Sequence, residues 1–99
     1  MDLRAYQDEL LELADRNGWG EYSSERNLAQ ATLTEAAELA ELYQWGEHVT
    51  QSRAEDEAAD VMIFLLQYCD RAGVDLEAAV AAKINKNWKR EPNGPRFKK

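Results

Sequence analysis

Residues 25–45 read ERNLAQATLTEAAELAELYQW, and residues 55–72 read EDEAADVMIFLLQYCDRA. Apolar residues recur at intervals of three or four in both stretches, which is the period of an amphipathic α-helix. A glycine, Gly46, follows the first stretch, and a short polar segment then leads into the second. The two stretches therefore predict two helices, whose apolar faces meet if the helices pack antiparallel.

Four acidic side chains lie on these helices where apolar residues are expected. They form two pairs with a spacing of three: Glu35 with Glu38, and Glu57 with Asp60. Residues three apart lie one turn apart on the same helix face, so each pair can reach one point. A buried carboxylate is costly unless it is neutralised, paired or bound to a metal. The pattern predicts an acidic site that binds a hard divalent cation, and Mg²⁺ is the cation that suits carboxylate and phosphate oxygens.

The rest of the chain also indicates helices. With 99 residues, 44% of them hydrophobic and 31% charged, the chain is expected to form one small globular domain. It has only two prolines and is rich in Ala, Leu and Glu, which favours an all-α fold. We expect a four-helix domain over residues 1–92 and a flexible basic tail over residues 93–99. The expected helices cover about residues 2–17, 24–45, 52–72 and 75–90.

Capping residues and glycines define these limits. Ser23 or Ser24 is a suitable N-cap for the second helix. Ser52 followed by Glu55 has the spacing of a capping box for the third, Thr50 has it less fully, and Asp75 is a suitable N-cap for the fourth. The apolar side of the first helix is formed by Leu3, Tyr6, Leu10, Leu11 and Leu13.

The net charge of −7 is distributed unevenly. Residues 1–82 carry 18 acidic and 5 basic side chains, whereas residues 83–99 carry 1 acidic and 7 basic ones. A surface that is acidic over most of the chain argues against non-specific nucleic-acid binding, and we expect no nucleic acid among the partners. Taken alone, the basic end could bind nucleic acid, contact the phosphates of a small ligand, or simply add solubility.

Nothing in the sequence indicates a membrane or secretory protein. The longest apolar run, residues 61–66, is too short to span a bilayer, and residues 2–17 are charged throughout. Cys69 is the only cysteine, which excludes an intrachain disulfide, and we expect it to be a small apolar residue within the third helix. A cytoplasmic setting is therefore expected.

The fourth helix adds basic and amide groups. Lys83, Asn87 and Arg90 follow one another at intervals of four and three, and they share a face with Leu76 and Val80. This face is expected to point inward. Lys and Arg side chains beside a carboxylate-bound metal can contact phosphates. Trp19 and Trp45 flank the second helix, and either can stack on a base.

Taken in order, Glu-x-x-Glu, Glu-x-x-Asp, GVDL and the Lys–Asn pair resemble the MazG-type all-α nucleoside triphosphate pyrophosphatases, and most closely their dCTP pyrophosphatase branch. The resemblance covers about residues 17–90. It implies Mg²⁺-dependent hydrolysis of a nucleoside triphosphate, dCTP-like by preference, to the monophosphate and pyrophosphate in nucleotide-pool house-cleaning. Mn²⁺ would be a substitute metal.

The same resemblance implies roles for particular residues. Glu35, Glu38, Glu57 and Asp60 would bind the metal and carry catalysis. The substrate would be contacted by Trp19, Asn27, Trp45, Phe64, Lys83, Asn87 and Arg90, although Phe64 lacks the hydroxyl of the tyrosine that the branch can carry. Family members assemble into dimers or tetramers, so the implied domain is completed as a helical bundle by homo-oligomerisation.

An alternative function is compatible with the residues alone. The chain can be a non-catalytic helical module that oligomerises or binds nucleotide without hydrolysing it. In a binding module, the carboxylates would be paired with Lys83, Arg53 or Arg71. Pyrophosphate release distinguishes the two hypotheses. Base and sugar preference, the number of metal ions and the residue that activates water do not follow from the sequence.

Overall fold

The computed structural model describes residues 2–20 and 23–90, which form four α-helices and no strand. The all-α prediction is therefore confirmed, while the expected domain limit at residue 92 and the tail lie outside the described residues. The helices are α1 (Leu3–Arg16), α2 (Glu25–Glu41), α3 (Gln51–Ala72) and α4 (Leu76–Trp88).

Each helix begins at a side chain that caps its first turn. Ser24 Oγ accepts a hydrogen bond of 3.1 Å from the backbone N–H of Asn27, and the predicted caps Ser24 and Asp75 are both confirmed. Of the two caps that the sequence suggests for α3, Thr50 and not Ser52 is the N-cap. The Thr50 hydroxyl accepts from the backbone N–H of Arg53 at 3.4 Å, and the helix begins at Gln51, one residue before the expected start.

Helix α2 is shorter than its sequence period suggests. It ends at Glu41, whereas the prediction extended it to Trp45. Over residues 42–44 each backbone N–H donates to the carbonyl three residues earlier, at 3.1–3.3 Å. This is the tighter 3₁₀ pattern that often ends an α-helix. Gly46 then adopts a φ of 146°, which takes the chain out of the helical direction.

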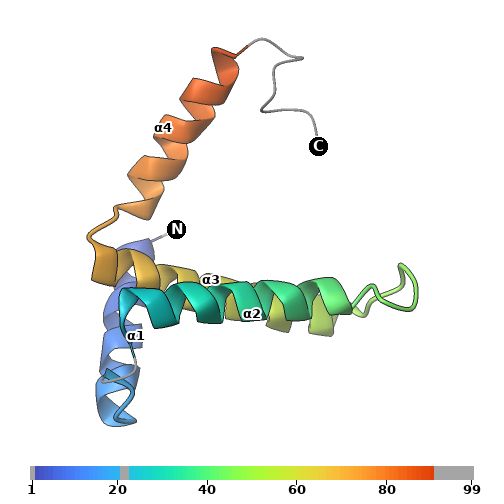
Figure 1. The fold of residues 1–99 in the computed structure, drawn as a ribbon, viewed down its shortest axis with the longest axis horizontal. Helices are drawn as coiled ribbons and strands as arrows, with labels where there is room; N and C mark the ends of the chain where they lie inside the picture. Colours follow the sequence, from blue (N-terminus) through green and yellow to red (C-terminus); the bar gives the residue numbers. More distant parts are fainter. Residues whose placement is uncertain (1, 21–22, 91–99) are drawn as a thin grey trace.

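Helices α2 and α3 form an antiparallel hairpin, and α1 crosses it at the end remote from the α2–α3 loop (Figure 1). The predicted inner faces are the less exposed ones in both helices of the hairpin. The buried apolar residues of the described chain gather where the three helices meet, and Cys69 is among them. They are Ala14, Leu28, Leu66 and Cys69.

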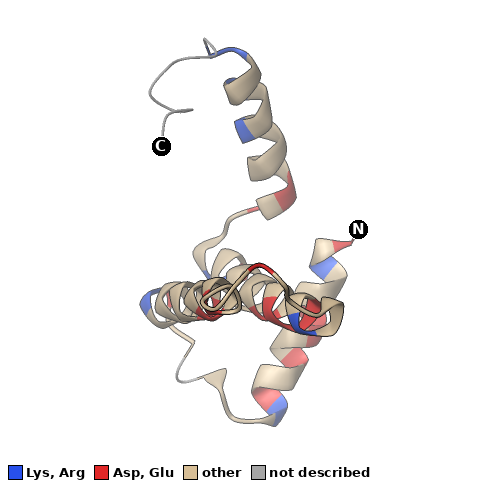
Figure 2. Ribbon diagram, turned by 90° about the vertical axis from the view of Figure 1, so that its right-hand side faces the viewer, with Lys and Arg blue, Asp and Glu red and all other residues tan. Residues whose placement is uncertain are grey.

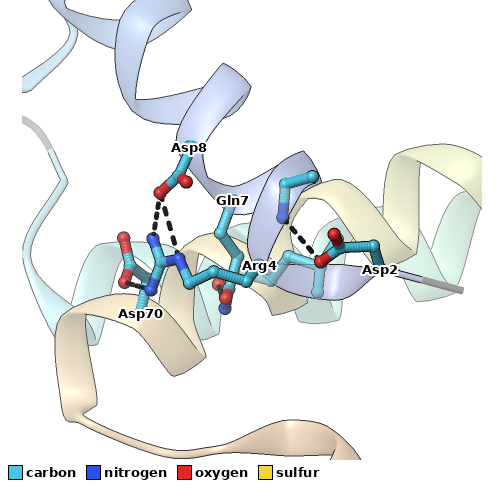
Figure 3. A network of polar contacts seen from close by, with 7 residues as sticks. Asp2, Arg4, Gln7, Asp8 and Asp70 are labelled. Atoms are coloured by element: carbon cyan, nitrogen blue, oxygen red, sulfur yellow. Dashed lines mark hydrogen bonds and ion pairs between the residues drawn. The ribbon is translucent and has the colours of Figure 1, made fainter.

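Polar contacts attach α1 to α3 (Figure 3). The Arg4 guanidinium lies 2.8 Å from Asp70 Oδ1 and 2.9 Å from Asp8 Oδ1. The side-chain amide of the buried Gln7 donates a hydrogen bond of 3.0 Å to the Leu66 carbonyl. The Arg4–Asp70 and Gln7–Leu66 contacts join residues 66 and 59 positions apart, and they orient α1 across the base of the hairpin.

Helix α4 extends away from the hairpin and makes only slight contact with the other helices (Figure 1). Val80, Ile84 and Trp88 are 47%, 52% and 83% exposed. The prediction that the apolar face of this helix points inward is therefore wrong for a single chain. The cause is the turn at Gly73, whose left-handed φ of 70° ends α3 and redirects the backbone after it.

The charges of the described residues also differ between the second half of α4 and the other three helices. Acidic residues lie on α1, α2 and α3, whereas the second half of α4 is basic (Figure 2). In residues 2–20 and 23–90, no helix combines the length and the apolarity that are needed to cross a membrane.

Candidate metal centre

The hairpin brings carboxylates from both of its helices together, as the sequence predicts. Carboxylate oxygens of Glu35 on α2 and of Glu57 and Asp60 on α3 all lie within 4.8 Å of one another. The amphipathic period points these residues toward the facing helix, and the antiparallel pairing brings them to the same level. Glu35 and Glu57 are half-buried as a result.

Glu38 extends this group on α2, and we call the four residues Glu35, Glu38, Glu57 and Asp60 the carboxylate cluster. The pKa of Glu35 is raised from its ordinary value of 4.5 to about 7. The largest cause is the Glu38 carboxyl, which can share a proton with Glu35 in a hydrogen bond; partial burial and the negative charges of the cluster add to it. When no cation is bound, the Glu35–Glu38 pair therefore holds a proton more readily than ordinary carboxyls do.

Glu57 is in a similar environment. Its pKa is raised chiefly by burial, and the nearby charges of Glu38 and Asp60 raise it further. Glu35 Oε2 and Glu57 Oε2 are both buried without a hydrogen-bond partner. Buried carboxylate oxygens that no donor satisfies are costly, and a bound cation would offset the cost.

The geometry fits a hard divalent cation well. Several carboxylate oxygens converge from two helices, no histidine or cysteine is among them, and two of the oxygens are unsatisfied. An all-oxygen set of this kind suits Mg²⁺ or Mn²⁺ better than zinc or copper. The alternative in which arginines neutralise the cluster is not favoured, because neither Arg53 nor Arg71 forms an ion pair within the described ranges.

The predicted nucleoside-contacting residues lie at opposite ends of the hairpin. Trp19 follows α1 and is 50% exposed, with Asn27 nearby in the first turn of α2. Trp45 lies in the α2–α3 loop and is 91% exposed. The 17 residues of α2 separate the two ends by about 25 Å at 1.5 Å per residue. One chain therefore does not bring Trp19 and Trp45 to a single nucleoside.

The remaining predicted substrate-binding residues also lie in two separate places. Phe64 is half-buried on α3, one turn beyond Asp60 and next to the carboxylate cluster. Lys83, Asn87 and Arg90 are on or just after α4, which does not pack on the hairpin. Asn87 Oδ1 is nevertheless buried without a hydrogen-bond partner. In the single chain, the carboxylates and the predicted phosphate-binding residues of α4 are thus apart.

Two hollows lie in the end of the molecule formed with α1. One, of about 560 Å³, is lined by residues of α1, by Gly73 and by the start of α4. The other, of about 410 Å³, is lined by Leu11, Ala14 and Leu28 among others. Neither hollow is lined by the carboxylate cluster.

Arg53 is suggested by the sequence only as a partner for the carboxylates. Arg53 lies on α3 one turn before Glu57, and its positive charge opposes the rise in the Glu57 pKa. Arg53 precedes Glu57 by four residues and Asp60 by seven, which aligns all three on one helix face.

Comparison with known proteins gives consistent results. No family model matches the chain. Two mammalian proteins named dCTP pyrophosphatase 1 are similar to it over 91 residues: the human protein is 36% identical and the rat protein 35%. Each alignment covers 82% of this chain and 54% of the relative, so the chain spans about half the length of these relatives.

A solved structure extends the similarity to the fold. The crystal structure of a pyrophosphatase from Archaeoglobus fulgidus superposes with a TM-score of 0.79 at 36% sequence identity. The match covers 87% of this chain and 88% of the archaeal one. Sequence and fold thus agree over most of both chains, and with the convergent carboxylates they establish that this chain belongs to the MazG-like all-α pyrophosphatase family.

Proposed function

We propose that the chain is a nucleoside triphosphate pyrophosphatase that hydrolyses its substrate to the monophosphate and pyrophosphate. The metal is Mg²⁺, with Mn²⁺ as a substitute, and the preferred substrates are deoxynucleotides, dCTP-like ones first. The role is house-cleaning of the nucleotide pool in a cytoplasmic setting. The names of the human and rat relatives support the substrate class.

One observation carries the proposal: oxygens of Glu35, Glu57 and Asp60 converge within 4.8 Å from two helices. Like charges at this separation repel one another, and this repulsion adds to the rise in the pKa of Glu35, caused first by the Glu38 carboxyl, and of Glu57, caused first by burial. A purely structural helix pair gains nothing from this arrangement. It is therefore best explained by a ligand that is itself strongly positive.

The residues of the cluster have distinct roles in this proposal. Glu35, Glu57 and Asp60 hold the metal, and Glu38 at the exposed edge orients the attacking water and accepts its proton. The bound Mg²⁺ would supply neutralisation of phosphate charge in the transition state and at the leaving pyrophosphate. Phe64 forms an apolar wall beside the cluster.

The substrate-binding residues that lie apart in one chain point to an oligomer. A second copy must supply part of the substrate-binding set. With it, the phosphates are contacted by Lys83, Asn87 and Arg90, and the nucleoside is contacted by Trp19, Asn27 and Trp45. The exposed apolar residues of α4 give that copy a surface to pack on, with Val80 and Ile84 about half exposed. A dimer or a tetramer would meet this requirement.

The surface area supports the same proposal. The chain exposes 8042 Å², whereas a compact monomer of 11.3 kDa exposes about 5,700 Å². Its radius of gyration is 16.0 Å, against about 13 Å for a compact domain of this length. The excess of roughly 2,300 Å² per chain is in the range that obligate interfaces bury.

The test is a panel of nucleoside triphosphates and deoxynucleoside triphosphates incubated with the protein and Mg²⁺, with pyrophosphate and monophosphate both quantified. Equimolar release that stops with EDTA supports the proposal. Asp60→Asn is expected to abolish it, whereas the matched control Glu55→Gln, five residues earlier on the outer side of α3, keeps wild-type turnover. A folded protein that binds nucleotide and metal without releasing pyrophosphate would instead be the non-catalytic module.

A further inference from the structure

Arg53 shares a helix face with the metal-binding carboxylates of α3. It precedes Glu57 by four residues and Asp60 by seven, which are offsets of about 40° and 20° around the helix. Along the helix axis, Arg53 is about 6 Å from Glu57 and about 10 Å from Asp60. An extended arginine side chain can therefore reach a ligand that is bound at these carboxylates. Arg53 is thus on the α2–α3 loop side of the cluster.

The Arg53 guanidinium forms no ion pair and no side-chain hydrogen bond within the described residues, although its charge acts on Glu57. The side chain is exposed, and the only hydrogen bond of this residue outside the helix pattern runs from its backbone N–H to Thr50 Oγ1. Arg4, by contrast, is held by two carboxylates, Asp8 and Asp70. A spacing of four from Glu57 would permit an ion pair, yet none forms in the described part of the chain.

The hairpin has no other cation at this position. Of the arginines on α2 and α3, Arg26 is at the start of α2 and Arg71 is in the last turn of α3. Arg71 is 14 residues beyond Glu57, about 21 Å along the axis. A triphosphate adds several negative charges to a cluster of four carboxylates, more than the divalent metal alone balances. A nearby guanidinium is suited to this task, since its planar fork pairs with two phosphate oxygens.

We propose that Arg53 binds the triphosphate of the substrate from the same chain that holds the metal, through its guanidinium and the phosphate oxygens. This rests on the proposed function, because it concerns the substrate of the same site. This role of Arg53 differs from that of the basic residues of α4, which must come from another copy to reach the phosphates. Each site would then combine one phosphate-binding residue in cis with others in trans.

The experiment compares Arg53→Gln, Arg53→Lys and the matched control Arg71→Gln, which removes the same charge from the far end of α3. Calorimetry measures binding of a non-hydrolysable α,β-methylene triphosphate with Mg²⁺, binding of the corresponding monophosphate, and binding of Mn²⁺ alone. Steady-state kinetics gives kcat and KM. Circular dichroism and light scattering check that every variant keeps the helices and the oligomeric state.

Arg53→Gln is expected to weaken triphosphate binding and to raise KM by about 10- to 100-fold, the usual effect of losing a charged hydrogen bond. Arg53→Lys restores part of the loss, the monophosphate is affected less, and Arg71→Gln matches the wild type. Mn²⁺ alone binds Arg53→Gln at least as tightly as the wild type, because a positive charge near the cluster has been removed.

The proposal is overturned if Arg53→Gln binds the triphosphate analogue like the wild type, or if it loses Mn²⁺ affinity to the same extent, which would mean that Arg53 only supports the carboxylates. Failure of the proposed function has a different signature: the wild type itself releases no pyrophosphate. Analogue binding by the wild type and the Arg53 variants still decides the role of Arg53 in that case.

Discussion

Glu35 and Glu57 come from different helices, yet their carboxylate oxygens lie within 4.8 Å of each other, and the Oε2 atom of each is buried without a hydrogen-bond partner. Two like charges held this close without donors destabilise the fold that holds them. We interpret the pair as a preformed cation site, and the following predictions test its consequences.

Glu57→Gln is expected to have opposite effects on stability and activity. In the absence of metal at about pH 8, it removes one repelling charge, so the midpoint of thermal unfolding rises. Mg²⁺ then stabilises the variant less than the wild type, and pyrophosphate release falls by about 100-fold or more. Differential scanning fluorimetry with and without Mg²⁺ measures the first two effects. A variant that is less stable without metal, and still responds fully to Mg²⁺, would contradict the prediction.

The raised pKa of Glu35 predicts a pH dependence of metal binding. Metal must displace the proton, so affinity increases as pH rises toward about 7 and then levels off. At about pH 6, one unit below that pKa, protonation of this group lowers the affinity for the metal about tenfold. Calorimetry of Mn²⁺ binding at several pH values measures it, and Glu35→Gln should flatten the profile.

The same pKa predicts how the metal-free protein responds to pH. The folded pKa of Glu35, about 7, is above its ordinary value of 4.5, so the folded state holds the extra proton. The contribution of this group to stability is complete below about 4.5 and is lost as pH rises through about 7. Unfolding in urea at about pH 5.5 and pH 8 should show this loss in the wild type. Unfolding of Glu35→Gln should depend less on pH over the same interval.

Ile84→Glu is expected to disrupt the oligomer. Ile84 is 52% exposed on α4, and a charge there would be buried in any interface that covers this helix. Light scattering should show a shift toward monomer, with pyrophosphate release reduced in parallel because α4 residues are no longer supplied in trans. Asn85→Glu adds the same charge at a neighbouring, exposed position of α4 about 100° around the helix. An oligomer that survives Ile84→Glu unchanged would exclude this face as the contact.

Leu66→Ala tests the core where α1 meets the hairpin. Leu66 is 3% exposed, and its carbonyl accepts the Gln7 amide. Removing its side chain leaves a cavity, which costs about 2–5 kcal/mol of unfolding free energy. Leu11→Ala, at a position 54% exposed, should cost clearly less. Urea unfolding followed by circular dichroism compares the two, and equal losses would contradict the assigned core.

The sequence by itself determined the local features of this protein. The four helices follow from the apolar period, and three of their ends follow from residues that act over one turn: Ser24, Asp75 and Gly73. The inward position of the carboxylate pairs is also local, because a spacing of three sets their common face on each helix. Family membership follows from the order of these motifs along the chain.

Only the tertiary structure decided the relations between helices. The left-handed turn at Gly73 directs α4 away from the hairpin, and α2 separates Trp19 from Trp45 by its whole length. Neither relation is contained in the period of a single helix, because both depend on the direction of the chain after a turn and on which faces find a partner. The unsatisfied oxygens of Glu35 and Glu57 also depend on the packing of helices and not on the period of one helix. They exist because two helices, each regular on its own, bring like charges to one level when they pack.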